Sequence, residues 1–180
     1  MAAGVGAMAL VPEVVEAVAP IPVLVAGGVA DGRGLAAAVV LGAAGANVGT
    51  RFLATEEASV DPRWKQRILD VESEEAVRFE AWGAILPPSE RGYDVVPRVI
   101  RTDFVATWEG RKEEAGRHAE RLRTEIMTAI EEGRPHEMTP FAGQSAGLVQ
   151  EVLPAAKVVR AISEEAEQAL ERTAALRRAK

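Results

Sequence analysis

The stretch PVLVAGGVADGRGLAAAVVLGAAGANVGT, residues 22–50, decides the fold. Within it, residues 22–26 and 45–49 are short, mostly apolar runs, as expected of parallel strands buried on both faces. Between the two runs, Asp31 is a suitable N-cap for a helix over residues 33–41. A strand, a helix and a strand in about 30 residues form a βαβ unit, so the sequence predicts neighbouring parallel strands with a right-handed crossover.

The segments on either side of this unit are expected to be mainly helical. Before it, valines at helical spacing predict a helix over residues 11–18, with Pro12 in its first turn and Pro20 beyond its end. After it, the sequence predicts a helix that begins at Asp61 and continues, with or without a break, to Gly83. The remaining expected elements are a loop at 86–92, an extended segment at 96–102, a helix at 110–132, a loop at 134–147 and a helix from Pro154. The apolar faces of the last two helices are expected to carry Ala115, Leu122, Ile126 and Ile130, and Val158, Val159, Ile162, Ala166 and Leu170, respectively.

Composition excludes several classes of protein. Hydrophobic residues make up 48% of the 180 residues, which is enough to form a core, but aromatic residues make up only 4%, so small aliphatic side chains must fill it. The net charge of −6 argues against nucleic-acid binding. The chain has no Cys, so disulfides and thiolate metal sites are excluded. The apolar start has no basic region and is interrupted at Pro12, so we expect no signal peptide, no membrane span and a cytoplasmic location.

Two glycine-containing loops follow the predicted strands. The first contains Gly27 and Gly28, and the second runs from Asn47 to Phe52. Glycine after a parallel strand lets the backbone approach a ligand closely, and the N–H groups of a following helix can point at an anion. Consecutive loops of this kind form the phosphate site of many (β/α)₈ barrels. Glycines at such positions also make ordinary tight turns, so the pattern alone leaves both interpretations open.

The polar side chains of these loops have simpler interpretations. Asp31 is expected to cap a helix rather than to act as a catalyst. Arg33 and Arg51 are expected to be exposed ion-pairing groups, or else to lie near a phosphate. Thr50 could donate its hydroxyl to a phosphate oxygen or cap the next helix. The loops contain no Gly-x-Gly-x-x-Gly pattern, so a Rossmann dinucleotide site is not indicated.

The sequence resembles the nitronate monooxygenase (2-nitropropane dioxygenase-like) family, specifically its C-terminal part. The resemblance is continuous from Ala9 to Ala58, and it includes the stretches PVLVAGGVADGRGLAAA and LGAAGANVGTRFLATEE. It returns in Arg98-Val-Ile-Arg and in Ala142-Gly-Gln-Ser-Ala-Gly-Leu-Val, in the order that the family uses.

The resemblance implies an α/β fold, the C-terminal portion of a TIM (β/α)₈ barrel with strands seven and eight and a mostly helical C-terminal extension. Residues 1–58 would be the partial FMN-binding barrel segment, and residues 59–180 the helical cap and C-terminal segment packing on it. The cofactor would be FMN, whose phosphate would be held by Gly27, Gly28, Asn47, Val48, Gly49 and Thr50. Asn47 replaces the Gln that is common in the family. Gln144 would approach the flavin.

The resemblance also implies a reaction, the oxidation of nitronates or nitroalkanes with O₂ to carbonyl compounds and nitrite. The family's catalytic-base His precedes the segment that begins at Val5, whereas the first His here is His118. Together with His136 it is expected to have a surface role, so no catalytic residue is assigned and the chain is interpreted as truncated. The alternatives are a flavin-dependent enoyl-acyl-carrier-protein reductase, and a non-catalytic fragment or assembly subunit that pairs through its strand edges, with homo-oligomerisation among the outcomes.

Overall fold

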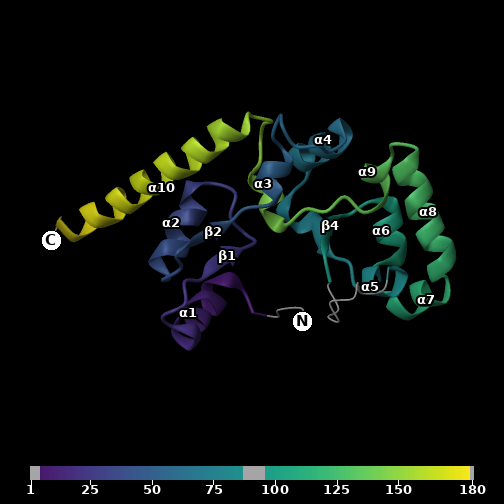
Figure 1. The fold of residues 1–180 in the computed structure, drawn as a ribbon, viewed down its shortest axis with the longest axis horizontal. Helices are drawn as coiled ribbons and strands as arrows, with labels where there is room; N and C mark the ends of the chain where they lie inside the picture. Colours follow the sequence, from purple (N-terminus) through teal and green to yellow (C-terminus); the bar gives the residue numbers. More distant parts are fainter. Residues whose placement is uncertain (1–4, 87–95, 179–180) are drawn as a thin grey trace. The chain divides into compact units, whose positions relative to one another are not determined.

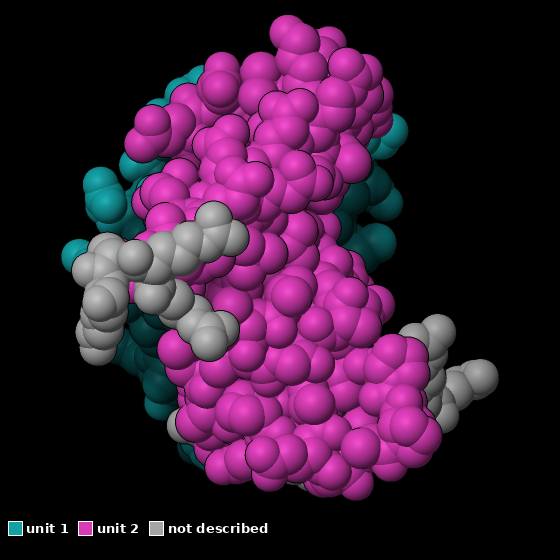
Figure 2. Space-filling view, turned by 90° about the vertical axis from the view of Figure 1, so that its left-hand side faces the viewer, with its two compact units in different colours: residues 1–3, 59–147 teal, residues 4–58, 148–180 magenta. Residues whose placement is uncertain are grey.

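The computed structural model describes residues 5–86 and 96–178. The chain forms two compact units, one containing Ser59–Gly147 and the other Gly4–Ala58 together with Leu148–Lys180 (Figures 1 and 2). The second unit therefore joins the glycine loops to the C-terminal helix. The roles that the resemblance implied for residues 1–58 and 59–180 stay a prediction.

The unit of residues 4–58 and 148–180 contains the predicted βαβ motif. Its elements are α1 (Ala7–Val18), β1 (Leu24–Ala26), α2 (Gly32–Val40), β2 (Gly45–Asn47), α3 (Thr50–Leu53) and α10 (Ala155–Arg178). Strands β1 and β2 pair in parallel, with Leu24 opposite Gly45 and Ala26 opposite Asn47. The prediction of neighbouring parallel strands bridged by a helix is confirmed, although both strands are shorter than expected.

The small sheet is covered on one face only. Val25 is buried and forms a core with Val11, Val29, Ala38 and Ala43. Leu24 is 60% exposed, so the prediction of strands buried on both faces is wrong for β1. The reason is that successive side chains of a strand point to opposite faces, and within this unit helices cover only the face that carries Val25.

The helices of this unit differ from expectation in two details. Helix α1 begins at Ala7, and Pro12 therefore lies inside it, where its missing N–H removes one helical hydrogen bond. On α10, the side chains of Val158, Ile162 and Ala166 are buried, as predicted. Val159 is 53% exposed and Leu170 36% exposed, so these two were wrongly assigned to the packed face. The buried positions are spaced by four residues and form a narrower stripe than the sequence suggested.

The unit of residues 59–147 is built around an antiparallel pair of strands. These strands are β3 (Ala76–Arg78) and β4 (Arg98–Ile100), with Val77 opposite Val99. The helical elements around them are α4 (Pro62–Asp70), η1 (Ser73–Glu75), α5 (Trp82–Ile85), α6 (Asp103–Trp108), α7 (Lys112–Arg117), α8 (Ala119–Glu131), α9 (Pro135–Met138) and η2 (Gln144–Leu148). Their shared core includes Phe79, Ile85, Val99, Val105 and Leu122.

Three sequence-based expectations for this unit need correction. The helical segment expected over 61–83 breaks after Asp70, and the chain forms β3 before α5 begins at Trp82. Residues 76–78 form a strand because pairing with the distant β4 outweighs local helical preference. The helix expected over 110–132 breaks at His118, and Ile130 near its end is 48% exposed. The loop expected over 134–147 contains α9 and most of η2. The loop expected at 86–92 lies almost entirely outside the described residues.

None of the helices in the described part of the chain combines the length and the apolar character needed to cross a bilayer.

Candidate functional site

The first glycine loop leaves β1 directly. Gly27 and Gly28 have φ values of 96° and 78°, in the left-handed region that side chains with a Cβ rarely adopt. The loop then turns inward, since Val29 and Ala30 are buried. Asp31 follows as the N-cap of α2, and its Oδ1 accepts a hydrogen bond from the Gly34 N–H at 3.1 Å. The prediction that Asp31 is a cap is therefore confirmed.

The second loop begins beside the first. Ala26 and Asn47 are paired partners at the ends of β1 and β2, so Gly27 and Val48 leave the same edge of the sheet. Neighbouring strands lie about 4.8 Å apart, which brings the two loop starts into reach of one small ligand group. Gly49 is the N-cap of α3, and its φ of −98° is an ordinary value. Thr50 is therefore the first residue of α3 and not its cap, which excludes one of the two roles considered for it.

The space above these glycines is open. A Cβ built on Gly27, Gly28 or Gly49 would meet no heavy atom within 4 Å. This contrasts with Gly32, where a Cβ would lie 2.3 Å from the Glu165 Cβ because two helices touch there. The three loop glycines thus leave room for an external group, and side chains at these positions would fill that room.

The N-terminus of α2 is occupied by the protein's own carboxylates. Besides the Asp31 cap, the Glu165 Oε2 accepts a hydrogen bond from the Gly32 N–H at 2.9 Å. Burial opposes ionisation of Asp31, but hydrogen bonds from Arg33 and from the Gly34 N–H outweigh it and lower the pKa of that carboxyl. The N–H groups of Gly32 and Gly34, which were expected to be able to bind an anion, therefore already donate hydrogen bonds to Glu165 and Asp31. An anion at this site would depend on the backbone of the two loops instead.

The two arginines of the loops differ in their surroundings. Arg33 is exposed, and its Nε donates to the Asp31 carboxylate at 2.8 Å, as one of the predicted roles requires. Arg51 is only 8% exposed, which corrects the expectation of a surface ion pair. Its guanidinium donates to the Ala54 and Glu151 carbonyls at 3.1 and 3.2 Å. Burial lowers the pKa of Arg51, and the charge of Glu151 opposes this effect.

Gln144, the remaining predicted contact, belongs to the other unit. It opens η2, and its side chain is exposed, whereas Ser145 and Ala146 are buried. It stays a prediction that Gln144 contacts the flavin.

The two histidines have different environments. His118 is exposed between α7 and α8, with its ring 6.0 Å from that of Trp108, so the predicted surface position is confirmed. His136 is only 8% exposed, and its predicted surface position is wrong. Its ring is buried because α9 packs against α4, α6 and α8. The sequence signal that could have shown this is Pro135, a residue favoured in the first turn of a helix, directly after the predicted helix over 110–132.

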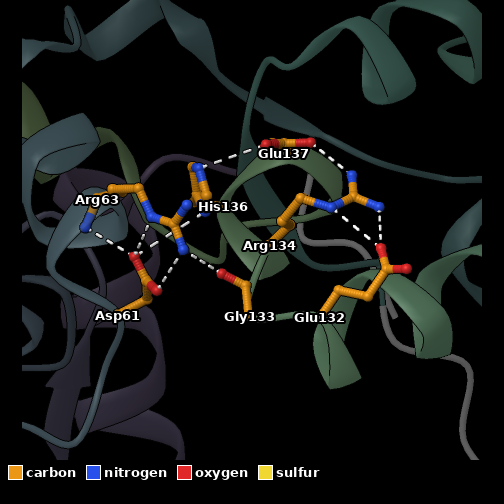
Figure 3. Close-up of polar contacts among 7 residues, drawn as sticks. All are labelled: Asp61, Arg63, Glu132, Gly133, Arg134, His136 and Glu137. Atoms are coloured by element: carbon orange, nitrogen blue, oxygen red, sulfur yellow. Dashed lines mark hydrogen bonds and ion pairs between the residues drawn. The ribbon is translucent and has the colours of Figure 1, made fainter.

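His136 lies within a cluster of charged groups (Figure 3). Its Nδ1 is 4.0 Å from the Asp61 Oδ1, and its Nε2 is 3.7 Å from the Glu137 Oε1. Arg63 binds Asp61 and donates to the Gly133 carbonyl, while Arg134 bridges Glu132 and Glu137. Hydrogen bonds from the Arg63 side chain and backbone lower the pKa of Asp61 to about 2. These contacts fasten α4 to the end of α8 and to α9, which is a structural role.

Comparison with known proteins gives consistent results. The sequence model of one family, nitronate monooxygenase, matches residues 1–165. Nitronate monooxygenase npaC of Metarhizium robertsii is 35% identical over 172 residues, which cover 89% of this chain and 46% of that protein. A probable nitronate monooxygenase of Staphylococcus haemolyticus is 44% identical over 103 residues, or 57% of this chain and 26% of that protein.

Two solved structures share the fold. FabK from Thermotoga maritima has a TM-score of 0.78 and 34% identity, covering 96% of this chain and 52% of that one. Nitroalkane oxidase from Streptomyces ansochromogenes has a TM-score of 0.74 and 28% identity, covering 96% of this chain and 46% of that one. The present chain thus spans at most about half the length of these proteins.

Proposed function

Because this chain belongs to the nitronate monooxygenase family, we propose that its two glycine loops bind the phosphate of FMN. The observation that carries the proposal is the open space over Gly27, Gly28 and Gly49, at one edge of a parallel pair of strands. Each glycine removes a side chain from the place where a phosphate oxygen would meet the backbone. Enzymes of this family are flavin-dependent oxidoreductases in general.

In this proposal β1 and β2 correspond to strands seven and eight of a (β/α)₈ barrel, whose following loops often bind phosphate. The similarity to larger solved structures over 96% of the chain supports it. Backbone N–H groups around Gly28 and Gly49 would hold the phosphate. Asn47, Val48 and Thr50 would complete the site, and Gln144 would approach the ring system of the flavin.

The proposed reaction of the whole protein is oxidation of nitronates or nitroalkanes with O₂ to carbonyl compounds and nitrite. The flavin supplies the redox chemistry when bound, and the residues of this chain orient it. If the whole protein releases nitrite from a nitronate in air without NAD(P)H, this result supports the proposed reaction. Reduction of an enoyl thioester that requires NAD(P)H would instead support the reductase alternative.

The proposed phosphate site, called the cradle below, consists of Gly27, Gly28, Asn47, Val48, Gly49 and Thr50. It is tested by Gly49→Val, because the φ of Gly49 suits any residue and its surroundings are open. We expect FMN affinity to fall by at least about tenfold, since contacts with a charged phosphate are lost. Folding stability should fall by no more than about 1 kcal/mol, because Val is a poorer N-cap residue than Gly. Flavin fluorescence titration measures the affinity, and thermal unfolding measures the stability.

The matched control is Gly6→Val, since Gly6 also has open surroundings and an ordinary φ of −70°. Equal FMN affinity in the wild-type chain and the Gly49→Val variant would refute the cradle. A wild-type chain that does not bind FMN would refute the proposed function of this segment.

A further inference from the structure

The segment that includes residues 148–166 contacts the chain next to both glycine loops. On the side of the second loop, the Arg51 guanidinium donates to the Glu151 carbonyl, and the Glu56 N–H donates to the Leu153 carbonyl at 3.1 Å. The Glu57 carboxylate in turn accepts a hydrogen bond from the Ala155 N–H at 2.8 Å. The chain that follows Gly49 is therefore tied to the segment entering α10 by several independent bonds.

On the side of the first loop, α10 rests on the start of α2. Gly32 lies so close to α10 that an added Cβ would be 2.4 Å from the Ala166 N and 2.6 Å from the Ile162 carbonyl oxygen. At the same place Glu165 accepts the Gly32 N–H. Gly32, four residues after Gly28, is thus held to α10 both by close packing and by a hydrogen bond.

The two contacts differ in burial, because Arg51 is buried, whereas Glu165 is exposed and its hydrogen bond with the Gly32 N–H is partly buried. Arg51 lies two residues after Gly49, and its buried guanidinium has two carbonyl acceptors. Removing a donor from a buried carbonyl costs more than a surface contact would, because the carbonyl loses its partner without regaining water. Glu165 bonds to the first residue of the helix that continues the Gly27–Gly28 loop, so it limits how far that loop can move.

We propose that residues 148–166 form a brace that holds both halves of the phosphate cradle in place. The positioning residues are Glu165 of the brace and Arg51 of α3, which binds the brace at Glu151. The role in binding rests on the proposed function, whereas the mechanical role of the brace does not. Neither side chain needs to touch the cofactor. Glu165 acts through the Gly32 N–H on the first loop, and Arg51 acts through α3 on the second loop.

The test of Glu165 uses the 180-residue chain with Glu165→Ala, Glu165→Gln and the control Glu167→Ala, which changes an exposed residue of the same helix. Amide hydrogen exchange of residues 27–34 is measured without ligand, and FMN affinity by fluorescence titration with inorganic phosphate as competitor. We expect Glu165→Ala to speed exchange in this loop and to weaken FMN binding about 3- to 10-fold. Glu165→Gln retains an acceptor oxygen, so its exchange rate in residues 27–34 and its FMN affinity should both lie within about twofold of the wild-type values.

The test of Arg51 uses Arg51→Met and Arg51→Lys, with exchange followed in residues 47–53. We expect faster exchange in Arg51→Met, weaker FMN binding, and partial rescue by Arg51→Lys, which keeps a cationic donor. If Arg51→Met does not fold, as judged by circular dichroism, the comparison of Arg51→Lys with the wild type gives the result. The Arg51 Nη1 donates to both carbonyls, and the shorter Lys side chain does not bring its ammonium to the position of Nη1.

The outcomes separate the two proposals. Unchanged exchange in both loops of the Glu165→Ala and Arg51→Lys variants would overturn the brace. Faster exchange with unchanged FMN affinity, or exchange that rises equally throughout the unit, would overturn the positioning role. A wild-type chain that does not bind FMN would overturn the proposed function and the positioning role with it, while the exchange data would still decide whether the brace exists.

Discussion

Single glycines in the cradle differ in a way that the sequence does not display. Gly28 needs a positive φ, whereas Gly49 has an ordinary one, and the surroundings of both are open. A substitution at Gly28 therefore combines backbone strain with occlusion of the ligand space. A substitution at Gly49 produces occlusion alone.

This difference predicts a pair of results for Gly28→Ala and Gly110→Ala. Gly110 has a φ of 73° and equally open surroundings, but it lies in the unit without the cradle. Both variants should lose about 1–2 kcal/mol of folding free energy, because a Cβ is strained in the left-handed region. Only Gly28→Ala should also lose FMN affinity in fluorescence titration. Loss of affinity in both variants would show that the effect comes from destabilisation alone.

The lowered pKa of Asp61, at the start of α4, predicts that its contribution to folding stability depends on pH. Its carboxylate caps the helix through the Arg63 N–H at 2.8 Å, and its pKa is lowered from 3.8 to about 2. A lowered pKa means that the contribution to stability is present above 3.8 and is lost as the pH falls through about 2. The stability difference between the wild type and Asp61→Ala should thus be constant near neutral pH and shrink below pH 3.8.

Urea unfolding at a series of pH values measures this difference, with Glu131→Gln as a control on the exposed end of α8. A difference that stays constant down to pH 2 would show that the carboxylate charge of Asp61 does not contribute.

Helix α10 is long, but only a narrow stripe of its side chains packs against the rest of its unit. It is 24 residues long, and its buried side chains Val158, Ile162 and Ala166 lie in its first half. Residues 171–176 are exposed, so the described end of the helix has little packing. The packing of the described part of α10 therefore lies mainly at its contact with α2.

Ile162→Ala and Val159→Ala test this distribution. Ile162 is 9% exposed, and its truncation should cost about 2–5 kcal/mol, as is usual for buried Ile. Val159 is 53% exposed, and its truncation should change stability by less than about 0.5 kcal/mol. Chemical unfolding followed by circular dichroism gives both values. Similar losses in the two variants would indicate that α10 is rotated from the described orientation.

At the scale of the whole molecule, the division into two units can be followed spectroscopically. The sequence has three Trp, and Trp64, Trp82 and Trp108 all belong to the unit of residues 59–147. Trp fluorescence therefore reports on that unit, whereas far-ultraviolet circular dichroism reports on both.

We expect Ile162→Ala to shift the unfolding midpoint measured by circular dichroism more than the midpoint measured by Trp fluorescence. The physical reason is that each unit has its own core, so losing a core side chain in one need not unfold the other. Equal shifts with both probes would show that the two units unfold as one cooperative body.

Local patterns in the sequence determined the βαβ unit, the Asp31 cap and the position of the glycine loops. Each depends on residues close together in the chain: a short apolar run, a capping side chain before a helix, and glycine where the backbone must turn. The parallel pairing follows too, since a strand, a helix and a strand of these lengths have few other ways to pack.

Tertiary structure alone decided the contacts between distant segments. Residues 76–78 are a strand because they pair with residues 98–100. Glu165 occupies the α2 N-terminus, Arg51 reaches the Glu151 carbonyl, and His136 is buried against α4. A helical pattern shows which side chains share a face but not which distant group meets them, because the free energy of such contacts depends on packing that no local window contains.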